Sequence, residues 1–227
     1  MGLIPLCLIG AVVSLDTFAI FQVLISQPIV ACTLIGWLSN DPMTGIQIGL
    51  LMQLIWISTL PVGAVTIPDG NLGAIIATII AVNTVGIVPD YKSLVILFAI
   101  IFGLLMSFVG AHALNTVRTG NVYILNQLLN RVEAMKLNQV GKAISYSLTF
   151  NFIILFAMIL SSTLIGISMI EAILVNNVES WIQYTRYADI AIFGSGAGLT
   201  FTLVKGYKPK IIIAVLILIV LSLMLWI

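Results

Sequence analysis

Three of the four aspartates in the first 91 residues, Asp16, Asp41 and Asp69, stand among long apolar runs. The same stretch contains no lysine, arginine or histidine. A carboxylate without a basic neighbour is expensive in hydrocarbon, so such residues usually face a water-filled cavity or a polar ligand. The first 91 residues therefore predict a binding site rather than a plain membrane anchor.

Amide and aromatic side chains accompany these carboxylates between residues 14 and 71. A carboxylate can accept the vicinal hydroxyls of a sugar in pairs, amides both donate and accept hydrogen bonds, and an aromatic face covers the apolar side of a sugar ring. The residues that supply this chemistry are Asp16, Gln22, Gln27, Gln53, Trp56, Asp69 and Asn71. The cluster suits a sugar or a similarly polar solute.

The three aspartates and Gln53 also have a structural interpretation. Asp41, in SNDP, is expected to be an interfacial turn or helix cap. Asp69, in IPDG, has the sequence of a tight turn, and the turn and ligand roles stay open. Asp16 can cap the helix that follows it, but its depth favours a functional role. A lone membrane glutamine such as Gln53 often bonds only to a neighbouring helix.

The sequence indicates no catalytic apparatus. It contains no nucleophile–base pair, metal-ligand spacing or nucleotide signature, so we expect no catalytic residue, metal or cofactor. Cys7 and Cys32 are isolated in apolar runs and are expected to be buried packing residues. Three glycines of FGSGAGLT, Gly194, Gly196 and Gly198, favour close helix packing. A near-neutral net charge of +1 argues against a nucleic-acid partner.

The composition identifies the class of protein that must hold the cluster. Hydrophobic residues make up 61% and charged residues 7% of the 227 residues, against roughly 45–50% and about 25% in soluble domains. We therefore expect an all-α, polytopic membrane protein in which residues 1–227 form a single membrane-embedded transport domain. The length allows about six to eight membrane-embedded elements.

The elements of the first third are predicted to be short and broken. Apolar segments cover residues 3–13, 18–25, 29–38, 46–60, 72–88, 94–114, 144–170, 188–204 and 211–227. Most of the first five are too short to cross a membrane comfortably and predict re-entrant or half helices. Residues 18–38 are interrupted at Ser26, Gln27 and Pro28, where proline disfavours helix. The freed backbone groups need protein or a wet cavity, which is where a polar solute binds.

Two basic connectors, residues 115–142 and 205–210, are predicted to be cytoplasmic, which places residues 171–187 outside. Residues 115–142 also alternate apolar and polar side chains at helical spacing, as in an amphipathic helix. Such a helix either rests on the membrane interface or offers a docking surface to a soluble partner.

Four stretches of the cluster carry a family resemblance. They are SLDTF, SQPIVACTLIGWL, NDPMTGIQIGLLMQLIWI and PVGAVTIPDG, in this order over about the first 75 residues. The sequence resembles the membrane component called enzyme IIC of the mannose–fructose–sorbose type of bacterial sugar phosphotransferase system. Two positions differ from many members: Thr17 replaces a second acidic residue and Gln53 a frequent glutamate. Both changes reduce the charge of the motif.

The resemblance implies a non-catalytic permease component in the bacterial inner membrane. Such a component works with a D-type membrane partner and with A-type and B-type cytoplasmic phosphocarrier proteins, and takes up a hexose-like sugar while phosphoenolpyruvate supplies its phosphoryl group. We also expect it to be oligomeric. Carried over by motif, the sugar-binding positions are Asp16, Gln27, Gln53 and Asp69.

Two other functions stay open from the sequence. An ion-coupled secondary transporter of a small polar solute would use Asp16 or Asp69 as its proton or sodium site. A membrane scaffold without transport activity is disfavoured by the acidic, polar first third.

Overall fold

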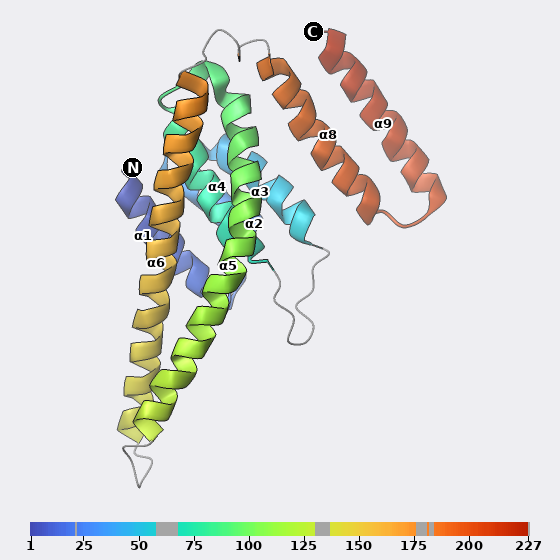
Figure 1. Ribbon diagram of the computed structural model, residues 1–227. Helices are drawn as coiled ribbons and strands as arrows, with labels where there is room; N and C mark the ends of the chain where they lie inside the picture. Colours follow the sequence, from blue (N-terminus) through green and yellow to red (C-terminus); the bar gives the residue numbers. More distant parts are fainter. Residues whose placement is uncertain (21, 58–67, 130–136, 176–180, 182–183, 227) are drawn as a thin grey trace.

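The computed structural model describes residues 1–20, 22–57, 68–129, 137–175, 181 and 184–226, which form an all-α fold (Figure 1). The helices are α1 (Leu3–Leu15), α2 (Pro28–Leu38), α3 (Pro42–Trp56), α4 (Gly70–Val85), the 3-10 turn η1 (Pro89–Tyr91), α5 (Lys92–Leu129), α6 (Leu137–Val175), α8 (Thr185–Leu203) and α9 (Tyr207–Trp226). The predicted all-α membrane class is confirmed.

The first four helices are short. They contain 13, 11, 15 and 16 residues. At about 1.5 Å per residue the longest measures roughly 24 Å, less than the roughly 30 Å hydrocarbon core of a bilayer. The expectation of short or broken helices in the first third is therefore confirmed. The described residues of the predicted apolar segment 18–25, namely 18–20 and 22–25, form no helix, and residues 23–27 follow turns and bends before α2 begins at Pro28.

Helix α4 lies at the centre of the fold and contacts α1, α2, α3, α5 and α6. Its Ile75, Ile76, Ile79 and Ile80 are fully buried, as expected for a helix that is apolar on every side. The small residues of α4 and α5 let the two backbones approach closely. A Cβ added to Gly103 would lie 2.6 Å from the Gly73 carbonyl oxygen.

Helices α2 and α3 form a tight hairpin whose interface is made of glycines. A Cβ added to Gly49 would lie 2.8 Å from the carbonyl oxygen of Pro28, and one added to Gly45 would overlap the carbonyl oxygen of Cys32. Cys32 is fully buried here, and Cys7 is fully buried on α1, so both cysteines are packing residues as predicted.

Helices α5 and α6 run side by side and extend together well beyond the short helices (Figure 1). Among the described residues, two stretches, Pro89–Gln127 and Gly141–Leu174, are long and apolar enough to cross a membrane. Helix α5 has 38 residues, which corresponds to about 57 Å at 1.5 Å per residue and exceeds a core of roughly 30 Å.

The amphipathic connector predicted at 115–142 is not a separate helix in its first half. Residues 115–129 continue α5 without a break, because no proline interrupts the helix between residues 92 and 129. Residues 130–136 of this connector lie outside the described part of the chain. The first half of the connector is therefore helical, as predicted, but it extends a long helix instead of lying apart from it.

Helices α8 and α9 form a second hairpin beside α5 (Figure 1). The Ser93 hydroxyl of α5 donates a hydrogen bond to Asp189 of α8. Of the three glycines predicted to pack closely on α8, only Gly196 does so within the described chain, where its Cβ would lie 3.0 Å from a Leu51 methyl group. A Cβ added to Gly194 or to Gly198 would meet no described atom within 4 Å.

Candidate functional site

The carboxylate of Asp16 organises the irregular segment that follows α1. Asp16 is 5% exposed. Its Oδ1 accepts a hydrogen bond from the Val23 backbone N–H at 2.8 Å. Its Oδ2 accepts from the Ser26 backbone N–H at 3.1 Å and from the Ser26 hydroxyl at 3.2 Å. These bonds tie residues 23–26 to the end of α1 and hold them outside any helix. Asp16 therefore does not cap a following helix.

The same segment contains unusual backbone conformations. Gln22 and Leu24 have φ values of 52° and 70°, in the left-handed region that residues other than glycine rarely adopt. Such conformations persist only where surrounding contacts hold them, and they cluster at functional sites. Gln22, one of the predicted polar cluster, is exposed. The segment ends at Gln27, and Pro28 occupies the first position of α2, where a missing N–H is tolerated.

Two predicted glutamines meet across the α2–α3 hairpin. The Gln53 amide nitrogen donates to the Gln27 amide oxygen at 3.1 Å. The Gln53 Oε1 atom is buried and has no hydrogen-bond partner among the described residues. Gln53 does bond to a neighbouring helix segment, as the structural interpretation predicted, yet its oxygen stays available for another donor.

Asn71, at the start of α4, joins this region to the segment after α1. Its amide nitrogen lies 3.4 Å from the Thr17 hydroxyl oxygen and 3.5 Å from that of Ser26. Ser26 thus contacts both Asp16 and Asn71, and its chain neighbour Gln27 contacts Gln53. We call these six residues the polar network: Asp16, Thr17, Ser26, Gln27, Gln53 and Asn71.

Asp69 lies two residues before Asn71 and caps α4. Its Oδ1 accepts from the Leu72 backbone N–H at 3.1 Å, and its own N–H donates to the Ser107 carbonyl oxygen of α5 at 2.8 Å. Asp69 is partly buried. The backbone role predicted from IPDG is therefore present, and it fixes the carboxylate at the N-terminus of α4 beside the polar network.

Trp56 closes one side of this region. Its ring lies so near the first turn of α4 that a Cβ added to Gly70 would overlap it. It also packs edge-on against Phe108 of α5, with ring centroids 6.4 Å apart. The Trp56 ring therefore lies beside Gly70, the residue that follows Asp69 in the chain.

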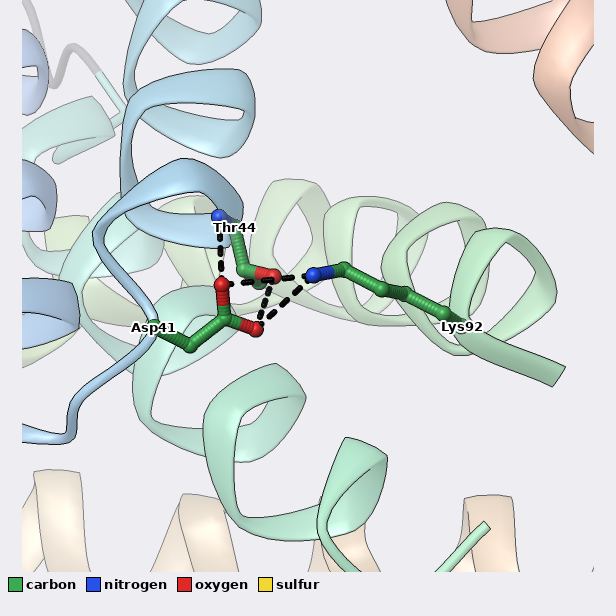
Figure 2. A network of polar contacts seen from close by, with 3 residues as sticks. All are labelled: Asp41, Thr44 and Lys92. Carbon is green, nitrogen blue, oxygen red and sulfur yellow. Dashed lines mark hydrogen bonds and ion pairs between the residues drawn. The ribbon is translucent and has the colours of Figure 1, made fainter. Parts of the chain in front are cut away.

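Asp41 is not a member of the polar network, and Figure 2 shows its contacts with Thr44 and Lys92. Its carboxylate accepts from the backbone N–H and the hydroxyl of Thr44, at 3.2 and 2.6 Å, and it pairs with the Lys92 ammonium at 3.0 Å. The predicted cap is confirmed. Partial burial alone would raise the pKa of this carboxyl, but the hydrogen bonds from Thr44 and Lys92 outweigh that effect and hold the pKa below its usual value.

Three of the four predicted sugar positions, Asp16, Gln27 and Gln53, belong to the polar network. The fourth, Asp69, lies two residues before Asn71, which is also a member of the network. Ser26 and Thr17 were missed as network members. Their signal was adjacency, since Thr17 follows Asp16 and Ser26 precedes Gln27. The described residues contain no group of three or more histidine, cysteine or acidic side chains able to hold a metal ion.

Four short helices around a partly buried polar network, beside two described helices long and apolar enough to cross a membrane, define a helical membrane protein. A family model described as the PTS system sorbose-specific IIC component matches residues 2–225. The chain belongs to this family, and the resemblance noted in its first 75 residues is confirmed.

Relatives of named function match over shorter stretches. The PTS system mannose-specific EIIC component of Escherichia coli (strain K12) is 36% identical over 76 residues, which are 34% of this chain and 27% of the relative. The sorbose-specific EIIC component of Klebsiella pneumoniae is 34% identical over 76 residues, again 34% and 27% of the two chains. That of Lacticaseibacillus casei is 36% identical over 56 residues, 25% and 20%. The matches thus span about a quarter of these relatives. No solved structure matches the chain significantly.

Proposed function

We propose that this chain is the sugar-translocating membrane component of a phosphoenolpyruvate-dependent sugar phosphotransferase system. The observation that carries the proposal is the family match over residues 2–225. The polar network supports it, because a buried hydrogen-bonding site within an apolar helical fold suits a polar solute in transit. The substrate is a hexose-like sugar.

Gln27, Gln53 and Asp69 are the proposed sugar contacts, and Asp16 belongs to the same site through Ser26. A buried acceptor left without a donor costs free energy. The Gln53 Oε1 atom is such an acceptor among the described residues, and a sugar hydroxyl would satisfy it. The Asp69 carboxylate would accept further hydroxyls, while the nearby Trp56 ring would cover the apolar side of the sugar.

The chain would work with a D-type membrane partner and with A-type and B-type cytoplasmic phosphocarrier proteins, in an oligomeric complex of the bacterial inner membrane. Phosphoryl transfer would belong to the partners, since the sequence offers no nucleophile–base pair of its own. The end of the α5–α6 pair would stand in the cytoplasm and contribute to docking of the phosphorylating protein. Arg118 and Lys142 are exposed on this part of the pair, so both can meet an acidic surface.

Uptake into membrane vesicles tests this proposal. Vesicles that contain the chain with its D-type partner should take up labelled sugar only when phosphoenolpyruvate and the soluble phosphocarriers are supplied inside, and the sugar should appear inside as sugar phosphate. Vesicles that lack this chain but contain the partners provide the control. Accumulation of unmodified sugar under a proton or sodium gradient alone would overturn the proposal in favour of the ion-coupled transporter.

A further inference from the structure

We propose that Asp16 is a positioning residue of the site rather than a ligand of the sugar. Its buried carboxylate holds the segment 22–27 in the shape that places Ser26 and Gln27 against α3 and α4. This inference rests on the proposed function, because it assigns Asp16 a task within the proposed sugar site.

The hydrogen bonds of Asp16 carry the first step. An ionised carboxylate offers about four lone-pair positions. Three donors already occupy three of these positions, namely the backbone N–H groups of Val23 and Ser26 and the Ser26 hydroxyl. All three belong to the segment that follows α1, and Asp16 is 5% exposed. Its carboxylate is therefore engaged by the protein itself.

The conformation of the segment carries the second step. Gln22 and Leu24 have φ values of 52° and 70°, and Val23, which donates to Asp16 Oδ1, lies between them. Two left-handed residues so close together need outside contacts to hold them. Asp16 supplies such contacts on both sides of Leu24, through the N–H groups of Val23 and Ser26.

The neighbours of the segment carry the third step. The Ser26 hydroxyl oxygen lies 3.5 Å from the Asn71 amide nitrogen, and the Gln27 amide oxygen accepts from Gln53 at 3.1 Å. Both contacts depend on where the segment places residues 26 and 27. A change at Asp16 would therefore reach α3 and α4 through the segment, without any contact between Asp16 and the sugar.

The first test is a double-mutant cycle in sugar binding by the purified complex, measured with the sugar that the vesicles transport. Asp16→Asn puts an amide N–H against the donors of the segment, and we expect affinity to fall on the order of tenfold or more. Gln27→Ala removes the side chain that Asp16 is proposed to place. Because both changes act through Gln27, the double variant should lose clearly less than the product of the two single losses. Losses that multiply would indicate an independent contact of Asp16 with the sugar and would overturn the proposal.

The second test follows the segment without sugar. Ser26 is 2% exposed, so a Ser26→Cys thiol should react slowly with a small maleimide in the otherwise unchanged chain. Adding Asp16→Asn should release the segment and raise the reaction rate at least several-fold. Cys7 and Cys32 are fully buried and give little background. Asp41→Asn, which removes a capping carboxylate elsewhere, is the matched control and should leave both the thiol rate and the sugar affinity unchanged.

The outcomes separate this inference from the proposed function. If the thiol of Ser26→Cys stays protected when Asp16→Asn is added, the carboxylate does not hold the segment and the inference is wrong. If the unchanged complex binds no sugar, the proposed function fails, while the thiol rates still decide whether Asp16 holds the segment. Should Asp16→Asn fail to fold, Ser26→Ala removes only one of the three donors, and a smaller loss of sugar affinity in the same direction is expected. Parent-like affinity in Ser26→Ala would then count against the inference.

Discussion

Asp69→Asn separates the capping role of this residue from its proposed role at the sugar. The Asp69 Oδ1 atom accepts the Leu72 backbone N–H at 3.1 Å, and asparagine keeps an oxygen there and is as good an N-cap as aspartate. The backbone bond from Asp69 to Ser107 is unaffected by the side chain. The folded protein should therefore be preserved, and the change falls on the charge and on the second carboxylate oxygen.

The expected loss comes from that charge. Hydrogen bonds to charged groups contribute about 1.5–3 kcal/mol, so the sugar affinity of Asp69→Asn should fall roughly 10- to 150-fold. Calorimetric titration of the purified complex with sugar measures it, and a thermal melt in the same detergent checks that folding is intact. Asp41→Asn is the matched control, because Asp41 also caps a helix but pairs with Lys92 away from the polar network. If both variants bind sugar like the parent, Asp69 is only a cap and the site has been misplaced.

Three further predictions follow from the fold. Gly49→Ala should lower the melting temperature, because its Cβ would lie 2.8 Å from a backbone oxygen and such overpacking costs about 1–3 kcal/mol; Gly194→Ala, which meets no described atom within 4 Å, should not. A cysteine at Asn126, which is exposed on α5, should react with an impermeant reagent only from the cytoplasm, and labelling of intact cells from outside would refute the topology. The hydrogen bonds from Thr44 and the ion pair with Lys92 lower the pKa of Asp41 in the folded state, so the ionised carboxylate stabilises the protein above the unfolded pKa of about 3.9. In melts against pH, the advantage of the parent over Asp41→Asn should shrink below that value and vanish as pH falls through the folded pKa, whereas an advantage that persists in acid would contradict this account.

The short helices could be predicted because particular residue types mark where they begin. Pro28 and Pro42 stand at the first positions of α2 and α3, and Asp41 and Asp69 cap α3 and α4. Prolines and capping residues act on the nearest turn and so are visible in the sequence. The unbroken continuation of α5 to Leu129 was not predicted. Near residue 115 the sequence changes from apolar to amphipathic, which looks like the end of one helix. The backbone nevertheless stays helical through this change.

Several residues of the polar network were predicted from the sequence, but their contacts were not. The pattern identified Asp16, Gln27 and Gln53 because polar side chains are rare and costly in apolar segments. It did not reveal that Asp16 bonds to the Val23 and Ser26 N–H groups. Which donor a carboxylate meets depends on the path of a non-helical segment, and no periodicity describes such a path.

The enclosure of α4 has a consequence for the order of events during synthesis. The Asp69 N–H bonds to Ser107 of α5, and Asp41 pairs with Lys92, the first basic residue of the chain. Helices α3 and α4 therefore meet these partners only after α5 has left the ribosome. Until then they lack both the length to cross a bilayer and a positive charge to fix their orientation. We expect the nascent first third to remain held by the insertion machinery, or by a membrane chaperone, until α5 arrives to complete it.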